Sequence, residues 1–270
     1  MSRFPLNEKL KRVITAVILL PPLIFGVIKL NHFWFFILLL FFIYIATYEF
    51  SKLIEKAGGK FLKIPTFLGA FLIPYGFYLN DFKMFLLTVF VVSFSSLCIK
   101  LLGDKPLEFT FSTIGDTFLN IFYVPFFFSF VMLLRNLSYH YIFYLMIVIF
   151  LSDTFAYFFG IRFGKRRLYE IISPKKSLEG FIAGTLGGVI GGIFYGYLFL
   201  DLPIYHVLAS TLLVVFAGVI GDLTESMFKR KAGVKDSGNI FPGHGGMLDR
   251  VDALLFGAPV LYFYMSSFGL

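Results

Sequence analysis

The chain contains little of what a water-soluble or disulfide-stapled domain requires. Only 15% of its 270 residues are charged, whereas 58% are hydrophobic and 20% aromatic. A soluble domain needs a larger polar surface, so this composition predicts an integral membrane protein. The single cysteine, Cys98, excludes an internal disulfide, and without a CxxC pair the sequence has neither a zinc ribbon nor a dithiol redox centre.

Acidic residues are also scarce. The chain has 16 Asp and Glu residues against 24 Lys and Arg residues, which gives a net charge of +8. A basic balance can indicate nucleic acid as a partner. In a chain this apolar it indicates instead an unequal distribution of charge across a lipid bilayer, so no nucleic-acid partner is expected.

Long apolar runs recur along the sequence, and a run of about 17–25 residues can cross a bilayer as a helix. The runs predict an all-α, polytopic integral membrane protein with about nine transmembrane helices. The first follows a basic segment like that of a signal peptide, but no small-x-small cleavage site comes after it, so a retained helix is expected. The predicted spans lie near 13–30, 33–50, 64–79, 84–102, 117–134, 141–159, 181–200, 206–226 and 253–268.

Basic residues predict the orientation of these helices. Of the 24 Lys and Arg residues, only Lys29, Lys83 and Arg135 fall on one side of the predicted membrane. The positive-inside rule therefore puts the N-terminus in the cytoplasm, together with two long loops at 160–180 and 227–252. The expected location is the cytoplasmic (inner) membrane, with multiple passes and an active site that faces the cytoplasm.

Ionisable residues divide the chain functionally near residue 110. Residues 1–110 form N-terminal transmembrane helices that hold few buried ionisable groups beyond Glu49. Residues 111–270 carry Asp116, Asp153, Asp222 and Glu225 inside or at the edge of spans. Charged groups in a membrane are costly and are usually functional, so the second part is the predicted catalytic region.

A glycine-rich segment lies in the seventh predicted span. Gly184, Gly188 and Gly192 are four residues apart and share one helix face. Small residues allow helices in lipid to approach closely, within one bundle or across a dimer interface. We expect these glycines to pack helices within the bundle, and a homodimer interface is the alternative.

Acidic residues gather at the ends of the last two predicted spans. Asp222 and Glu225 are three residues apart near the end of the eighth span, and Asp249 and Asp252 are three apart at the start of the ninth. Converging carboxylates repel each other unless a cation lies between them. Oxygen ligands without a sulfur or histidine cluster favour Mg²⁺. In the alternative reading, Asp222 and Asp249 simply form ion pairs with neighbouring basic residues such as Lys229, Arg230 and Arg250.

Basic residues and glycines accompany these acids in both long loops. Mg²⁺ bound by one or two carboxylates leaves positions for substrate phosphates, whose remaining charge Lys and Arg can neutralise. Glycines in the segment PGHGG allow backbone N–H groups to approach anionic oxygens, or they form only a turn. His244 in the same segment is a candidate hydrogen-bond donor to a phosphate, or a proton carrier, although a lone histidine is more often structural. Together the loops predict phosphoryl or nucleotidyl chemistry at the inner membrane face.

The run from Ser226 to Asp252 closely resembles the signature of the phosphatidate cytidylyltransferases, also called CDP-diacylglycerol synthases. The segments SDTFAYFFGIRFGK and ISPKKSLEG resemble the same family. The N-terminal spans resemble the family only in hydropathy. The positions that match the signature are Ser226, Lys229, Arg230, Lys235, Asp236, His244, Gly245, Gly246, Asp249, Arg250 and Asp252.

The resemblance implies a Mg²⁺-dependent transfer from CTP to phosphatidic acid, in the bilayer, that produces CDP-diacylglycerol and pyrophosphate. In this interpretation Asp222 and Asp249 hold the metal, with or without a second cation. The catalytic residues are then Asp222, Asp249, Lys229, Arg230 and His244. The substrate-binding residues are Asp153, Lys175, Lys176, Ser177, Ser226, Lys235, Asp236, Gly245, Gly246, Arg250 and Asp252.

Three other functions compete with this interpretation. A CTP-dependent lipid kinase would use similar groups but transfer the γ-phosphoryl. A secondary transporter of an anionic substrate also explains buried acids and nine spans, but its polar residues would gather at the bilayer midplane rather than at one face. A structural scaffold leaves the clustered carboxylates unexplained.

Overall fold

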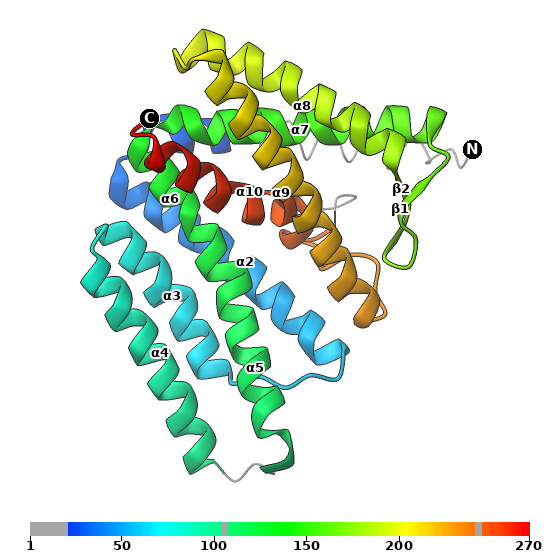
Figure 1. The fold of residues 1–270 in the computed structure, drawn as a ribbon. Coiled ribbons are helices and arrows are strands. Elements are labelled where there is room, and N and C mark those ends of the chain that lie inside the picture. The colour runs from blue at the N-terminus through cyan, green and yellow to red at the C-terminus, as the bar shows by residue number, and fades with distance from the viewer. Residues whose placement is uncertain (1–20, 104–106, 241–244) are drawn as a thin grey trace. The chain divides into compact units, whose positions relative to one another are not determined.

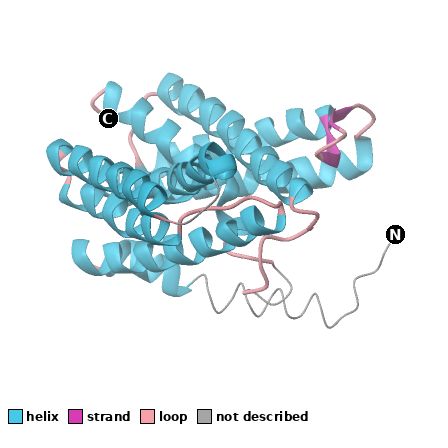
Figure 2. Cartoon of the chain, turned by 90° about the horizontal axis from the view of Figure 1, so that it is seen from below, coloured by secondary structure: helices cyan, strands magenta, loops and turns pink. Residues whose placement is uncertain are grey.

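The structure is a computed structural model that describes residues 21–103, 107–240 and 245–270 (Figure 1). Nearly all of the regular structure is helical, which confirms the all-α prediction. The one sheet in the described residues is a two-stranded hairpin, drawn in magenta in Figure 2. The labelled elements are α2 (His32–Lys56), α3 (Lys63–Leu79), α4 (Phe82–Leu102), η1 (Leu107–Phe109), α5 (Thr110–Ile121), η2 (Phe122–Phe126), α6 (Phe127–Leu137), α7 (Tyr139–Phe163), β1 (Arg167–Tyr169), β2 (Ser173–Ser177), α8 (Leu178–Phe199), α9 (Ile204–Lys231) and α10 (Leu248–Ser267).

Each predicted span after the first coincides with a described helix or, at 117–134, with the run from α5 to α6. Six helical segments in the described residues are long and apolar enough to cross a membrane. The protein is therefore a multi-pass membrane protein, while the count of nine spans stays a prediction. Of the first predicted span, 13–30, residues 13–20 lie outside the described residues and residues 21–29 are helical.

The chain forms two compact units. Unit 1 comprises Met1–Met132 and Lys231–Val251, and unit 2 comprises Leu133–Arg230 and Asp252–Leu270. These units are defined by how the chain packs. The predicted division near residue 110 was based on the positions of ionisable residues, and it stays a prediction.

Unit 1 is held together by packing of α2 to α5 and by a few polar contacts between them. The loop after α2 is tied to α5, because Lys60 N donates to Asp116 Oδ2 at 3.0 Å and Leu62 N donates to Thr117 Oγ1 at 2.9 Å. These contacts satisfy two backbone N–H groups of the loop. They fix the end of α2, the helix that carries Glu49.

Unit 2 is built on close packing of α8 against α7 and α9 (Figure 1). A Cβ added at Gly184 would come within 2.9 Å of the Ser152 carbonyl oxygen on α7, and one at Gly188 or Gly192 would contact α9. The predicted role of these glycines in packing within the bundle is confirmed. The homodimer stays a prediction.

Both long loops are shorter than predicted. Helix α7 continues to Phe163, and the rest of the first loop contains the β1–β2 hairpin (Figure 2). Helix α9 continues to Lys231, and α10 begins at Leu248. Hydropathy marks where apolar side chains stop, but Lys and Arg are good helix formers, so a helix continues past that point. Lys229 and Arg230 are therefore helical residues rather than loop residues.

Candidate functional site: an acidic cluster and the signature loop

Unit 2 brings three aspartates from three helices together. Asp153 lies on α7, Asp222 on α9 and Asp252 in the first turns of α10. Helices α9 and α10 approach so closely at Gly221 that a Cβ added there would contact the Asp252 carbonyl oxygen. The three carboxylates lie within electrostatic range of one another. We call Asp153, Asp222 and Asp252 the acidic cluster.

Lys176 of the hairpin supplies positive charge to this cluster. Its Nζ lies 2.5 Å from Asp222 Oδ2, and it also interacts electrostatically with Asp153. The other oxygen of the Asp222 carboxylate accepts a hydrogen bond of 3.3 Å from Ser226 Oγ. The side chains of Lys176 and Asp222 are 26% and 33% exposed, so a ligand can reach them. Asp222 thus has an ion-pair partner, but that partner is not one of the basic residues next to it in sequence.

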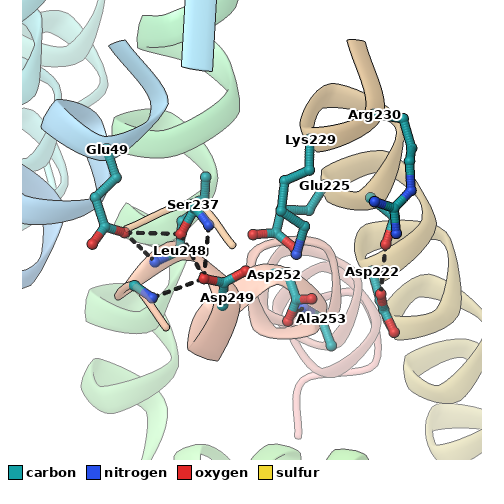
Figure 3. A network of polar contacts seen from close by, with 12 residues as sticks. Glu49, Asp222, Glu225, Lys229, Arg230, Ser237, Leu248, Asp249, Asp252 and Ala253 are labelled. Atoms are coloured by element: carbon teal, nitrogen blue, oxygen red, sulfur yellow. Dashed lines mark hydrogen bonds and ion pairs between the residues drawn. The ribbon is translucent and has the colours of Figure 1, made fainter. Parts of the chain in front are cut away.

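Two other predicted catalytic residues, Lys229 and Arg230, lie about two turns beyond Asp222 on α9. Lys229 forms an ion pair with Glu225, whose side chain is fully buried, and it also interacts electrostatically with Asp252 (Figure 3). Arg230 donates from Nε to the Ile172 carbonyl oxygen at 3.2 Å. Lys229 therefore brings positive charge to the acidic cluster, and Arg230 attaches α9 to the hairpin.

The hairpin itself is fastened to α8 at its base. Ser177 is the N-cap of α8, and its Oγ accepts from Gly180 N at 3.1 Å. Glu179 accepts hydrogen bonds from the backbone N–H groups of Lys165 and Arg166. Ser177 is buried, so its observed role is that of a helix cap, and its predicted contact with substrate stays a prediction. Lys175, the neighbour of Lys176, is exposed.

The segment between α9 and α10, described at 232–240 and 245–247, belongs to unit 1, and we call it the signature loop. It is organised around the Asp249 carboxylate. Asp249 Oδ2 accepts hydrogen bonds from Ser237 N at 2.9 Å, Ser237 Oγ at 2.9 Å and Gly246 N at 2.8 Å (Figure 3). Gly245 has a φ of 82°, a left-handed conformation that favours glycine. The anionic oxygen that the predicted glycine segment approaches is therefore one of the protein's own carboxylates.

Glu49 of α2 is a member of this loop's hydrogen-bond network that the sequence motifs do not identify. Its carboxylate accepts from Met247 N at 3.0 Å and Leu248 N at 2.8 Å, and its Oε2 lies 3.2 Å from Ser237 Oγ, whose single hydrogen it shares with Asp249 Oδ2. Glu49 is 3% exposed. The only signal in the sequence is that Glu49 is an acid inside an apolar span of the first hundred residues.

The remaining predicted residues have varied surroundings. Lys235, Asp236 and Arg250 are exposed in unit 1, and His244 lies outside the described residues. Asp222 and Asp249, the predicted metal ligands, belong to different units, so their shared ion stays a prediction. In the described part of the chain, no group of three or more His, Cys, Asp or Glu side chains is close enough to hold a metal ion. Any bound ion would need ligands from water or substrate.

Comparison with known proteins decides the family. The model of the Cytidylyltransferase family matches residues 10–268, which includes both units. The chain belongs to the cytidylyltransferase family. It is 34% identical over 261 residues to a phosphatidate cytidylyltransferase of Staphylococcus saprophyticus, and the alignment covers 93% of this chain and 95% of that relative.

Other members of the cytidylyltransferase family match a shorter part of the chain. A phosphatidate cytidylyltransferase of Bacillus subtilis is 42% identical over 164 residues, 59% of this chain and 61% of its own length. One of Staphylococcus aureus is 41% identical over 156 residues, 57% of this chain and 60% of its own length. The family signature extends across both units, because Ser226, Lys229 and Asp252 belong to unit 2 and Gly246 and Asp249 belong to unit 1.

Proposed function

We propose that this cytidylyltransferase transfers the cytidylyl group of CTP to phosphatidic acid and releases pyrophosphate, which makes CDP-diacylglycerol for phospholipid synthesis. The proposal is supported by the match to the family over nearly the whole chain and by the names of its relatives. The structural observation that carries it is the acidic cluster with Lys176 beside Asp222 in unit 2. Carboxylates and an ammonium group that lie together suit a metal-bound polyphosphate.

The reaction requires little covalent chemistry from the protein. An oxygen of the lipid phosphate attacks the α-phosphorus of CTP, and the bond from that phosphorus to the oxygen bridging to the β-phosphorus breaks. Pyrophosphate leaves with that bridging oxygen. Such transfers depend mainly on in-line positioning and on neutralising the charge of the phosphates. Lys176 and Lys229 are the basic residues of unit 2 that bring positive charge to the acidic cluster.

The acidic cluster fits Mg²⁺ by its chemistry. Asp222 lies within electrostatic range of Asp153 and Asp252, and its Oδ1 accepts from the Ser226 hydroxyl. These donors are all oxygen, which Mg²⁺ prefers, and Mg²⁺ usually binds one or two carboxylates and completes its shell with waters and substrate phosphates. When bound, the ion would neutralise phosphate charge and orient the α-phosphorus. Asp222 would hold it in unit 2, and Asp249 stays the second ligand predicted from the sequence.

Lys176 would move its contact from Asp222 to the substrate. The ammonium group of Lys176 balances the charge of Asp222. If Asp222 held the metal, Lys176 would be able to contact a phosphate oxygen of the substrate, and charge-assisted contacts of this kind are stronger than neutral hydrogen bonds. Ser226 Oγ, which donates to the other carboxylate oxygen, would keep Asp222 oriented.

The proposed site faces the cytoplasm at the inner membrane. The positive-inside rule supports this orientation, because the basic residues that flank the acidic cluster lie on the side richer in Lys and Arg. CTP is water-soluble and reaches such a site from the cytoplasm. Phosphatidic acid has two acyl chains and enters from the bilayer between helices.

A double-label experiment tests the reaction. Protein purified in detergent is given phosphatidic acid, Mg²⁺ and CTP labelled either at the α- or at the γ-phosphate. The expected result is α-label in the lipid product and γ-label in pyrophosphate. A lipid kinase would instead transfer the γ-label to the lipid, and this outcome, or no transfer of either label, would contradict the proposal.

A further inference from the structure

Glu49 is a buried acid far from the family signature, yet its hydrogen bonds are to the signature loop. It lies on α2, and it accepts hydrogen bonds from the backbone N–H groups of Met247 and Leu248 and from the hydroxyl of Ser237. A carboxylate inside a membrane-spanning helix is costly unless such donors compensate it. Both of its oxygens accept hydrogen bonds from the loop and the start of α10, so these contacts compensate the cost of burying the carboxylate.

Two glycines of the loop leave the space that Glu49 occupies. A Cβ added at Gly238 would contact Glu49 Oε1, and one added at Gly246 would contact Glu49 Oε2 and Ser237 Oγ. Any side chain at these positions would displace the carboxylate or the loop. Part of the glycine content of the loop is therefore explained by the close approach of backbone to Glu49.

Glu49 also completes the start of α10. Leu248 is the first residue of α10, and the first N–H groups of a helix have no partner within the helix. Glu49 accepts from Leu248 N and from the preceding Met247 N, although it is separated from them by about two hundred residues. A negative charge at a helix N-terminus is favourable. The direction of the first turn of α10, which carries Asp249, thus depends on Glu49.

Ser237 connects the two carboxylates. Its Oγ lies 3.2 Å from Glu49 Oε2 and 2.9 Å from Asp249 Oδ2, and its backbone N–H also donates to Asp249 Oδ2. One Asp249 oxygen is therefore held by Ser237 and Gly246, which orients the other. Groups that orient a ligand carboxylate in this way affect metal affinity without touching the metal.

We infer that Glu49 is a positioning residue for Asp249: it anchors Ser237 and the N-terminus of α10, so that the Asp249 carboxylate is presented in one orientation to the Mg²⁺–CTP substrate. This inference rests on the proposed function. Glu49 acts through the loop and needs no contact with substrate.

The variants Glu49→Gln and Glu49→Ala test the inference, with Asp116→Asn as the matched control. Asp116 ties a different loop of unit 1 to α5 by accepting from Lys60 N. Glu49→Gln keeps the length of the side chain and one acceptor oxygen, whereas Glu49→Ala keeps neither. The Mg²⁺ concentration at half-maximal activity should rise in the order wild type, Gln, Ala, by about 10- to 100-fold in total. Asp116→Asn should leave it unchanged even if the melting temperature falls.

Hydrogen–deuterium exchange provides a readout that does not depend on activity. The amides of Met247 and Leu248 should exchange at least about tenfold faster in Glu49→Ala than in wild type, because each loses its acceptor. Unchanged exchange there, or a wild-type Mg²⁺ requirement in Glu49→Ala, would overturn the inference. If the wild-type protein made no CDP-diacylglycerol, the proposed function would fail, while the exchange data would still report on the contact itself.

A double variant separates positioning from general destabilisation. If Glu49 acts through Ser237, the effects of Glu49→Gln and Ser237→Ala on the Mg²⁺ requirement should be less than additive, since both break the same chain of contacts. Fully additive effects would mean that Glu49 and Ser237 act independently, which contradicts the inference.

Discussion

Lys176 Nζ lies 2.5 Å from Asp222 Oδ2, and this contact joins the β1–β2 hairpin to α9 within unit 2. The hairpin is fastened to α8 by the Ser177 cap and to α9 by the bond from Arg230 to the Ile172 carbonyl. Lys176 is therefore held beside the acidic cluster by structure on both sides. In an otherwise apolar protein, this arrangement places the Lys176 ammonium group beside Asp222 and within electrostatic range of Asp153.

Asp222→Asn should abolish most of the activity. The substitution keeps the size of the side chain but removes the charge that would hold Mg²⁺. A bound metal ion stabilises the charge of the transition state by several kcal/mol in such transfers. We expect the rate of CDP-diacylglycerol formation to fall by about 100-fold or more. Asp201→Asn, outside the acidic cluster and at a left-handed position that Asn tolerates, is the control and should keep wild-type activity. Wild-type activity in Asp222→Asn would remove this residue from the site.

Lys176→Met and Lys175→Met should differ although the two residues are neighbours on β2. Lys176 contacts Asp222, whereas Lys175 is exposed. A hydrogen bond to a charged group contributes about 1.5–3 kcal/mol, so Lys176→Met should lower kcat/KM for CTP by about 10- to 100-fold. Lys175→Met should have a clearly smaller effect. Steady-state kinetics with CTP as the varied substrate measures both, and equal losses would argue against a specific role for Lys176.

Removal of divalent metal should stop the reaction. The acidic cluster offers oxygen ligands that need a cation to offset their mutual repulsion around a polyphosphate. Activity should vanish in excess EDTA and return on addition of Mg²⁺ or Mn²⁺, with no change in the circular dichroism spectrum. Full activity in EDTA after prior dialysis against the chelator would contradict a metal-dependent mechanism.

Close helix packing in unit 2 makes its glycines sensitive to substitution. A Cβ added at Gly187 of α8 would come within 2.8 Å of the Leu151 carbonyl oxygen, whereas at Gly115 of α5 it would meet nothing within 4 Å. Gly187→Ala should destabilise the protein by about 1–3 kcal/mol, because neither backbone can yield without separating the helices. Gly115→Ala should be neutral or stabilising by up to about 1 kcal/mol. Thermal unfolding in detergent would compare them, and equal melting temperatures would contradict this account.

The fold was largely predictable because apolar runs report directly on helices in a membrane. The acids at 222, 225, 249 and 252 could also be found, since their spacing puts each pair on one helix face. The ends of the helices could not be predicted, because an apolar run stops several residues before the helix that contains it ends. Lys229 and Arg230 therefore belong to α9 instead of to a loop.

Contacts between residues distant in sequence were beyond prediction from one sequence. Nothing local indicates that Lys176, among many basic residues, is the partner of Asp222. Likewise, no motif includes Glu49, which meets Leu248 only because α2 and the start of α10 pack together in unit 1. Such pairs are specified by tertiary packing. The sequence indicates them only by an isolated charged residue, such as Glu49 or Asp222, in an apolar span.

The central claim is that Asp222 holds a divalent ion that binds the phosphates of CTP. The most direct measurement is anomalous X-ray scattering from Mn²⁺ in crystals of the protein with a non-hydrolysable CTP analogue. We expect an anomalous peak at the Asp222 carboxylate, with phosphate oxygens of the analogue among the other ligands of the ion. A bound analogue whose Mn²⁺ makes no contact with Asp222 would contradict it.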